Sequence, residues 1–336
     1  MILPSAASGA APNTFSTASS NAKSRAQVVI VRDRQATRTF QPSPDRVRTM
    51  VNRALTNLTA KPTVATAWRS LVKTQDVVGL KVLTTPGPTS GTRPAVAAAV
   101  IEGLLAAGLP ATNIVVWDKH YEELREAGFP ELAQRYGVRV VGSADAGYDE
   151  NTFYENPVLG NLVWGDFEFG KKTEGAGRRS FVSKLVSQEL TKIINITPLL
   201  NHNQAGVAGN LFGLAMGSVD NTWRFEVQTG RLAQAVPEIY ALPAVGDRVV
   251  LNIVDALLCQ YQGNQRGLLH YSTTLNEIRL SRDPVALDVL SLKELDRQRQ
   301  SDDSPPGAVN MELYQNAALL ELGVADLKRI ETRTLK

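Results

Sequence analysis

Residues 193–213 have the sequence IINITPLLNHNQAGVAGNLFG, in which a β-branched run leads to a proline, a histidine and two glycines. A continuous apolar run of this kind favours a strand that is buried on both faces of a parallel sheet. Gly206 and Gly209 then permit a tight turn before an apolar segment of small residues. This order predicts a buried strand that brings His202 into a glycine-lined turn at the edge of an α/β sheet.

The same alternation of strand and helix signals runs along most of the chain. In residues 77–117, strand, loop, helix and strand follow one another, a unit that closes as a right-handed crossover between parallel strands. Ser43-Pro44 and Asp283-Pro284 mark helix starts. We therefore expect an α/β fold, with a mostly parallel twisted sheet flanked by helices. The expected strands are 27–32, 77–83, 113–117, 138–141, 192–197, 248–256 and 275–281, and the main expected helices are 46–58, 94–107, 207–216, 232–242 and 284–295.

Two regions depart from this pattern. Residues 146–183 are aromatic, glycine-rich and alternating in charge, so we expect an inserted β-hairpin region there, with residues 161–169 as its arm. The rest of residues 27–336 is expected to form a single α/β domain. Residues 1–26 are rich in Ala, Ser and Thr, contain no acidic residue, and lack the charged and apolar regions of a signal peptide. They are either a disordered tail or the remnant of an export signal.

Composition removes several functional classes. The 336 residues are 43% hydrophobic and carry a net charge of only +3, with scattered basic residues, so no nucleic-acid partner is expected. No apolar run approaches the ~20 residues of a transmembrane helix, so no membrane span is expected. The single cysteine, Cys259, excludes an intrachain disulfide and a cysteine-held iron–sulfur cluster, and we expect it to be a small buried hydrophobe.

Polar residues gather at the carboxyl ends of the predicted strands, where open α/β sheets bind ligands. His120 follows the strand 113–117 and is a candidate general acid or base, or a metal ligand, with Asp118 as its partner. The alternative is an exposed or capping histidine. His202 is a candidate for the same roles, with Asn201 beside it as a substrate-binding residue. The alternative for His202 is a ring that is satisfied within its own turn.

Other residues at this edge favour an anionic substrate. Thr92 and Arg93 precede the helix 94–107 and form a candidate clamp for a carboxylate or phosphate, although Thr92 alone could cap that helix. The backbone N–H groups of the turn from Gly206 to Gly209 would open at a helix start, which also suits an anion.

Two further carboxylates extend the candidate metal site. Asp220 and Asp255 follow glycine-rich and strand-like segments, and each could complete a divalent-metal shell or simply cap the backbone. His270 follows a glycine-rich loop and is expected to be solvated. The chain contains no HExxH, no Gly-x-Ser-x-Gly and no strand-linked GxGxxG, so the corresponding enzyme classes lose support. The candidate metal ligands are Asp118, His120, His202, Asp220 and Asp255.

Three segments resemble a known family, the domain-of-unknown-function family 362. They are INITPLLNHNQAGVAGNLFGL at 194–214, VLNIVDALLCQYQGNQRG at 250–267 and SRDPVALDVLSL at 281–292. This family is functionally mixed, and some members are exported by the twin-arginine route. The resemblance therefore implies an exported, periplasmic protein, with a cytoplasmic one as the alternative.

A more distant resemblance concerns the nickel-pincer lactate racemase family. Residues 89–120 (TSGTRPAVAAAVIEGLLAAGLPATNIVVWDKH) and 201–212 (NHNQAGVAGNLF) are similar to its two catalytic-histidine segments. The resemblance implies that His120 and His202 act as paired acid and base. That family tethers its cofactor through a lysine where this chain has Phe212, so a covalent pincer cofactor is not expected. A divalent metal bound directly by the histidines, or no metal, are the alternatives.

These features together predict a small-molecule or metal site at the carboxyl edge, with acid–base chemistry by a histidine pair on an anionic substrate. The alternative is a non-catalytic, exported solute- or metal-binding protein. A third interpretation is an interaction protein that self-associates into a homo-oligomer through residues 151–169.

Overall fold

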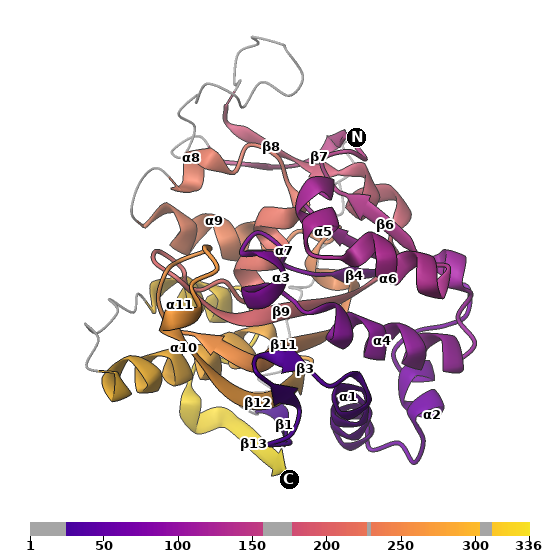
Figure 1. Ribbon diagram of the computed structural model, residues 1–336. Helices are drawn as coiled ribbons and strands as arrows, with labels where there is room; N and C mark the ends of the chain where they lie inside the picture. The colour runs from indigo at the N-terminus through magenta and orange to yellow at the C-terminus, as the bar shows by residue number, and fades with distance from the viewer. Residues whose placement is uncertain (1–24, 157–176, 227–229, 303–310) are drawn as a thin grey trace, which may run out of the picture.

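The computed structural model describes residues 25–156, 177–226, 230–302 and 311–336 (Figure 1). Residues 1–24 and the expected hairpin arm 161–169 lie outside the described residues. A nine-stranded sheet crosses the described part of the chain in the order β13-β1-β12-β11-β9-β4-β5-β6, with β10 paired to β9. Its strands are β1 (Ala26–Arg32), β4 (Val78–Lys81), β5 (Ile114–Asp118), β6 (Arg139–Gly142), β9 (Lys192–His202), β10 (Gly206–Val207), β11 (Val249–Gln260), β12 (Ser272–Ser281) and β13 (Ile330–Leu335).

The long path of the sheet is mostly parallel, which confirms the predicted α/β class. Strands β11, β9, β4, β5 and β6 pair in parallel, and β13 pairs in parallel with β1. Only β12 on this path runs against its neighbours. The connection 261–271 between β11 and β12 contains no α-helix in the structure, and parallel neighbours need a longer crossover than this loop offers.

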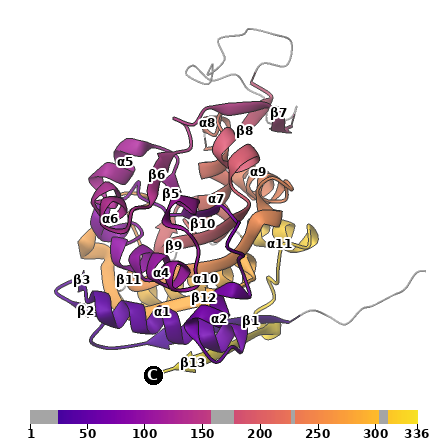
Figure 2. The same ribbon diagram turned by 90° about the vertical axis from the view of Figure 1, so that its right-hand side faces the viewer.

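Helices cover both faces of the sheet, so that two apolar cores form (Figures 1 and 2). Alternate residues of one strand enter different cores: Ile194 and Ile196 pack on the side of α1, while Ile193 packs on the side of α7. The first face carries α1 (Pro44–Thr59), α2 (Val64–Arg69), α4 (Pro94–Ala106), α5 (Tyr121–Glu126) and α6 (Phe129–Tyr136). The second carries α7 (Asn210–Ser218), α9 (Arg231–Tyr240), α10 (Pro284–Ser301) and α11 (Glu312–Leu319).

Smaller elements lie outside this sandwich. The strands β7 (Tyr148–Glu155) and β8 (Arg179–Ser183) form an antiparallel pair, which confirms the expected inserted hairpin region. The strands β2 (Thr37–Arg38) and β3 (Gln41–Pro42) form another. The short helices α3 (Gly87–Ser90) and α8 (Trp223–Glu226) belong to the connections after β4 and α7. No helix among the described residues is both long and apolar enough to cross a bilayer.

The strand β9 runs beyond its predicted end at residue 197 and includes His202. The predicted turn is a small hairpin, in which His202 pairs with Gly206 and Asn201 with Val207. Pro198 has no N–H for the ladder, and next to it the pairing with β11 shifts from Asp255 opposite Pro198 to Cys259 opposite Leu199. This bulge lets both strands continue past the proline.

The two predicted helix starts are correct in position but differ in chemistry. Asp283 caps α10, because its side chain accepts a hydrogen bond from the backbone N–H of Ala286 at 2.8 Å. A second oxygen of Asp283 accepts from the N–H of Val324 at 2.9 Å. Ser43 occupies the same position before α1, but its side chain makes no capping bond.

We predict that Asp283→Ala lowers the free energy of unfolding by about 1–2 kcal/mol, because it removes a cap. Ser43→Ala is the matched control and should change it by less than about 0.5 kcal/mol. Denaturant unfolding of both variants measures the difference. Equal effects of the two substitutions would contradict this assignment of the caps.

Candidate functional site

A buried ion pair joins the carboxyl ends of β4 and β5. The Lys81 Nζ donates to Asp118 Oδ1 at 2.7 Å and to the carbonyl of Val82 at 2.6 Å, and the two charged side chains are only 1% and 5% exposed. The other oxygen of Asp118 accepts from the backbone N–H and the hydroxyl of Thr84, both at 2.7 Å. This carboxylate, the expected partner of His120 and a candidate metal ligand, therefore fixes the loop after β4.

A second buried ion pair ties the same loop to β11. The Arg93 Nη1 donates to Asp255 Oδ1 at 2.8 Å, and the backbone N–H of Arg93 donates to Asp255 Oδ2 at 3.0 Å. The Thr92 hydroxyl donates to the carbonyl of Ile196 at 2.7 Å and accepts from the N–H of Leu83 at 3.0 Å. Both residues of the expected anion clamp are thus buried and bonded within the protein. Arg93, not Thr92, occupies the cap position of α4.

The imidazole of His202 is buried and is bonded by its own turn. Its Nδ1 accepts from the backbone N–H groups of Gln204, at 3.3 Å, and Ala205, at 3.0 Å. A neutral ring that accepts at Nδ1 carries its proton at Nε2. The ring packs on Phe212 with centroids 4.2 Å apart, and burial lowers the pKa of His202 to about 4. At neutral pH, His202 is therefore an uncharged side chain with an Nε2–H donor.

The neighbours of His202 bind the loop after β11. The Asn201 Oδ1 accepts from the backbone N–H of Asn264 at 3.0 Å, and the Asn264 Oδ1 accepts from the N–H of Asn203 at 3.1 Å. Gly206 has a φ of +84°, and a Cβ there would lie 2.6 Å from a methyl carbon of Leu292. The expected substrate-binding residues Asn201 and Gly206 therefore serve to build the turn.

The N-terminus of α7 is occupied by a carboxylate of the protein itself. The two oxygens of Asp288, on α10, accept from the backbone N–H groups of Asn210 at 2.7 Å and Leu211 at 2.9 Å. A Cβ on Gly209 would lie 2.3 Å from this carboxylate, which explains the glycine. Burial raises the pKa of Asp288 to about 6. The backbone donors that were expected to bind a ligand anion are thus used internally.

His120 lies apart from the His202 turn. It is exposed, precedes α5, and lines a cavity of about 720 Å³ together with Gly142, Asp145 and Lys184. No residue of the His202 turn lines that cavity, and no hydrogen bond or ion pair between described residues joins the two rings.

The helix α8 connects the loop of β5 with the turn of β9. The Lys119 Nζ donates to the hydroxyl of Thr222, just before α8, at 3.0 Å. The Gln204 side-chain amide donates to the carbonyl of Glu226, the last residue of α8, at 2.8 Å. Burial raises the pKa of the Glu226 carboxyl, and the charge of Lys119 opposes that shift.

Glu123 is a further polar group of this edge. The Thr85 hydroxyl donates to Glu123 Oε2 at 2.9 Å, and burial, followed by the charge of Asp118, raises the pKa of Glu123. Sequence reasoning assigned no role to Glu123, Lys81 or Asp288. A signal existed for two of them, because Lys81 and Asp288 each interrupt an otherwise apolar run.

The five expected metal ligands are not grouped around one point by any described contact. In the described part of the chain, no three His, Cys, Asp or Glu side chains are arranged to hold a metal ion. Asp220, the fifth of them, accepts from the backbone N–H of Phe181 at 2.5 Å. His270 is exposed, as expected, and its ring contacts Tyr271. Cys259 is fully buried, as expected, and burial raises its pKa to about 12.

The fold and this edge define an α/β protein whose strand-end loops are tied by buried ion pairs. The chain belongs to the family described as Domain of unknown function (DUF362), whose model matches residues 78–293. The predicted membership of this family is confirmed. No curated protein matches the chain. The resemblance to the lactate racemase family therefore stays a prediction.

Among solved structures, the chain is similar to a Thermotoga maritima protein from a structural genomics consortium. The identity is 12%, the TM-score is 0.39, and the alignment covers 78% of this chain and 60% of that one. The chain thus spans 60% of the length of this solved protein.

We predict that Asp118→Ala lowers the free energy of unfolding by about 3–5 kcal/mol, because it leaves the Lys81 ammonium buried without its partner. The matched control is Glu122→Ala, which breaks the exposed Glu122–Arg125 pair and should cost less than about 1 kcal/mol. Denaturant unfolding at neutral pH gives both values. A loss for Asp118→Ala no larger than that of the control would be incompatible with the buried pair.

We also predict a pH dependence of stability that belongs to His202. Its pKa falls from about 6.5 in the unfolded chain to about 4 in the folded one, so folding disfavours its protonation. The stabilisation is present above pH ~6.5 and is lost as the pH falls toward 4, by about 3 kcal/mol. Comparing the free energy of unfolding of wild type and His202→Gln at pH 7 and pH 4 isolates this contribution. The same pH slope in both proteins would refute it.

Proposed function

We propose that the carboxyl edge between the β5 loop and the β9 turn binds a small anionic molecule. The proposal rests on two hydrogen bonds to the ends of α8. Lys119 donates to Thr222 just before the helix, and Gln204 donates to the carbonyl of Glu226 at its end. A helix of four residues is only about 6 Å long. Side chains from two separate strand ends are therefore held within reach of one small ligand.

Lys119 supplies the charge that favours an anion in this proposal. It is half-buried, follows directly on the buried Asp118, and has its own backbone N–H bonded to Asp118 Oδ1 at 2.8 Å. A lysine held in this way presents a positive charge with little loss of side-chain freedom on binding. The charge of Lys119 also lowers the pKa of the half-buried Glu226 carboxyl, which burial raises.

The histidines have different parts in this proposal. His202 contributes its Nε2–H as a neutral hydrogen-bond donor to a carbonyl or carboxylate oxygen, since its Nδ1 is already occupied. His120 is exposed at the end of β5 and is the candidate general acid or base. Since no residue of the His202 turn lines the cavity of His120, the ligand would extend from Lys119 to that cavity for the two histidines to act on it as donor and proton carrier.

The two buried ion pairs support this location. Burying an ion pair stabilises a protein little in comparison with apolar residues of the same size. Lys81–Asp118 nevertheless joins the ends of the adjacent strands β4 and β5, and Arg93–Asp255 joins the start of α4 to β11, so that the two pairs hold the loop between β4 and α4. Rigid support of this kind is what a preorganised binding site requires.

The test is ligand retention and binding by the purified chain. Native mass spectrometry after incubation with a panel of small carboxylates and phosphates should show one bound anion. Lys119→Met should weaken its binding by about tenfold or more, since one charge-assisted contact is lost. Lys61→Met, which removes an exposed lysine elsewhere, is the matched control and should leave the affinity unchanged.

Turnover separates an enzyme from a carrier. If His120→Gln abolishes conversion of the bound anion but keeps its affinity, His120 acts in proton transfer. Binding by wild type without conversion favours the carrier. Absence of any bound anion, or equal binding by wild type and Lys119→Met, would overturn the proposed site.

A further inference from the structure

A groove of about 890 Å³ lies between α10 and the strands β12, β1 and β13, and none of the residues of the carboxyl-edge site lines it. Its size is within the range of small-molecule sites, about 300–1,000 Å³. The groove combines an apolar part with a dense group of charged side chains. The residues that line it include Ile30, Arg32, Glu277, Arg279, Leu290, Lys293, Glu294, Arg297, Leu327 and Lys328.

Strand alternation places the charges inside this groove. On β12, Ile278 and Leu280 face the core under α1, so Glu277 and Arg279 face α10. On the neighbouring strand β1, Arg32 pairs with Glu277 and Ile30 with Arg279. The floor of the groove therefore carries charged and apolar side chains next to each other.

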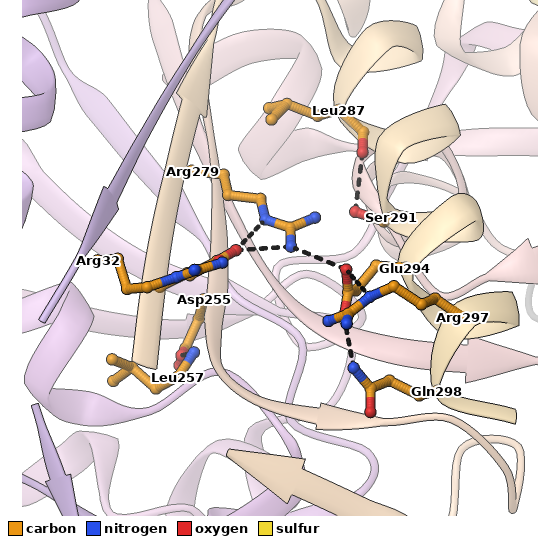
Figure 3. A network of polar contacts seen from close by, with 10 residues as sticks. Arg32, Asp255, Leu257, Arg279, Leu287, Ser291, Glu294, Arg297 and Gln298 are labelled. Atoms are coloured by element: carbon orange, nitrogen blue, oxygen red, sulfur yellow. Dashed lines mark hydrogen bonds and ion pairs between the residues drawn. The ribbon is translucent and has the colours of Figure 1, made fainter. Parts of the chain in front are cut away.

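The charges of this network do not cancel. Figure 3 shows Arg279 between Arg32 on one side and Glu294 with Arg297 on the other. Arg279 donates through Nε and Nη2 to Glu277 Oε2 at 2.9 and 2.7 Å, and Arg32 Nε donates to Glu277 Oε1 at 2.9 Å. Glu294 accepts from Arg297 at 2.6 Å and lies 3.9 Å from Arg279. Three guanidinium groups thus share two carboxylates.

Arg279 has donor capacity left over. Its side chain is only 5% exposed, yet it lines the groove, and its Nη1 donates to no residue that the structure describes. Nη1 is not one of the buried polar atoms that lack a partner, so this part of the guanidinium is accessible from the groove. The Nη1 is therefore a ready donor for an anion that enters the groove.

The rim adds further positive charge. Lys293 and Lys328 are exposed and line the groove, with Asp326 as an opposing carboxylate. Asp296, also at the groove, is paired with Arg299 at 2.8 Å and contributes little negative field. A negatively charged group is therefore attracted from solvent toward Arg279.

We propose that this groove binds a small amphipathic carboxylate, with its carboxylate at Arg279 and its apolar tail against Ile30, Leu290 and Leu327. Leu327 is 43% exposed, so a tail that covers it removes apolar surface from water. The planar guanidinium suits a carboxylate, and the uncancelled charge in the network selects an acid over a neutral alcohol of the same length.

Calorimetric titration with decanoate, below its aggregation concentration, tests the proposal. Decanoate should bind with one site per chain, while decanol and acetate should bind at least about tenfold more weakly, because each lacks one of the two recognised parts. Arg279→Lys keeps the charge but not the forked donor and should weaken decanoate binding by about tenfold.

Leu327→Glu places a negative charge in the groove, which repels the carboxylate ligand, so it should abolish binding. Because Leu327 is exposed, the variant should still fold. Leu319→Glu is its matched control, since Leu319 is 80% exposed and outside this groove. Failure of decanoate to bind wild type, or equal binding by the Leu327→Glu and Leu319→Glu variants, would overturn the proposal. Neither result bears on the carboxyl-edge site, because none of its residues lines the groove.

Discussion

The buried pairing of Lys81 with Asp118 is the interaction on which the carboxyl edge of the sheet depends. An ammonium group that is 1% exposed can remain charged inside a protein only if a counter-charge and hydrogen-bond acceptors surround it. Asp118 meets that requirement and at the same time holds Thr84 and Lys119 by their backbones. One desolvated pair therefore determines the path of the chain after both β4 and β5.

The same rule extends across the edge, where the protein satisfies its own charged and polar groups. Arg93 is matched by Asp255, the N-terminus of α7 by Asp288, and the backbone donors after His202 by its Nδ1. A ligand that enters here cannot use these groups without leaving a buried partner unpaired. Recognition must therefore come from the outer side chains, such as Lys119 and His120. The buried residues then act as their support.

The fold was largely predictable from the sequence because its signals are local. Apolar runs and helical spacing depend on neighbouring residues, and they located the helix starts at Pro44 and Pro284 and every strand of the sheet except β10 and β13, which were not predicted. The predicted length of β9 was wrong for a local reason. Pro198 favoured a strand end at residue 197, but a bulge in β11 opposite the proline lets β9 continue.

The bonding of the candidate site was not predictable, because it joins residues far apart in the chain. The partner of Arg93 is 162 positions away, and that of Asn210 is 78 positions away. From sequence, a threonine, an arginine and two glycines before helices suit an external anion as well as an internal carboxylate. Only the tertiary structure distinguishes the two, and it supplies Asp255 and Asp288. The sequence pointed to these polar residues, but it did not reveal their internal partners.

The carboxyl edge and the groove under α10 both concentrate charged side chains, but they differ in how well these charges are paired. At the carboxyl edge, each buried cation has its own carboxylate, so Lys81 and Arg93 attract no further anion. In the groove under α10, Arg279 shares both of its carboxylates with other arginines and keeps an unbonded Nη1. The uncancelled positive charge and the accessible Nη1 therefore favour an entering anion. A shortage of counter-charge therefore identifies a candidate ligand site more sharply than the presence of charge does.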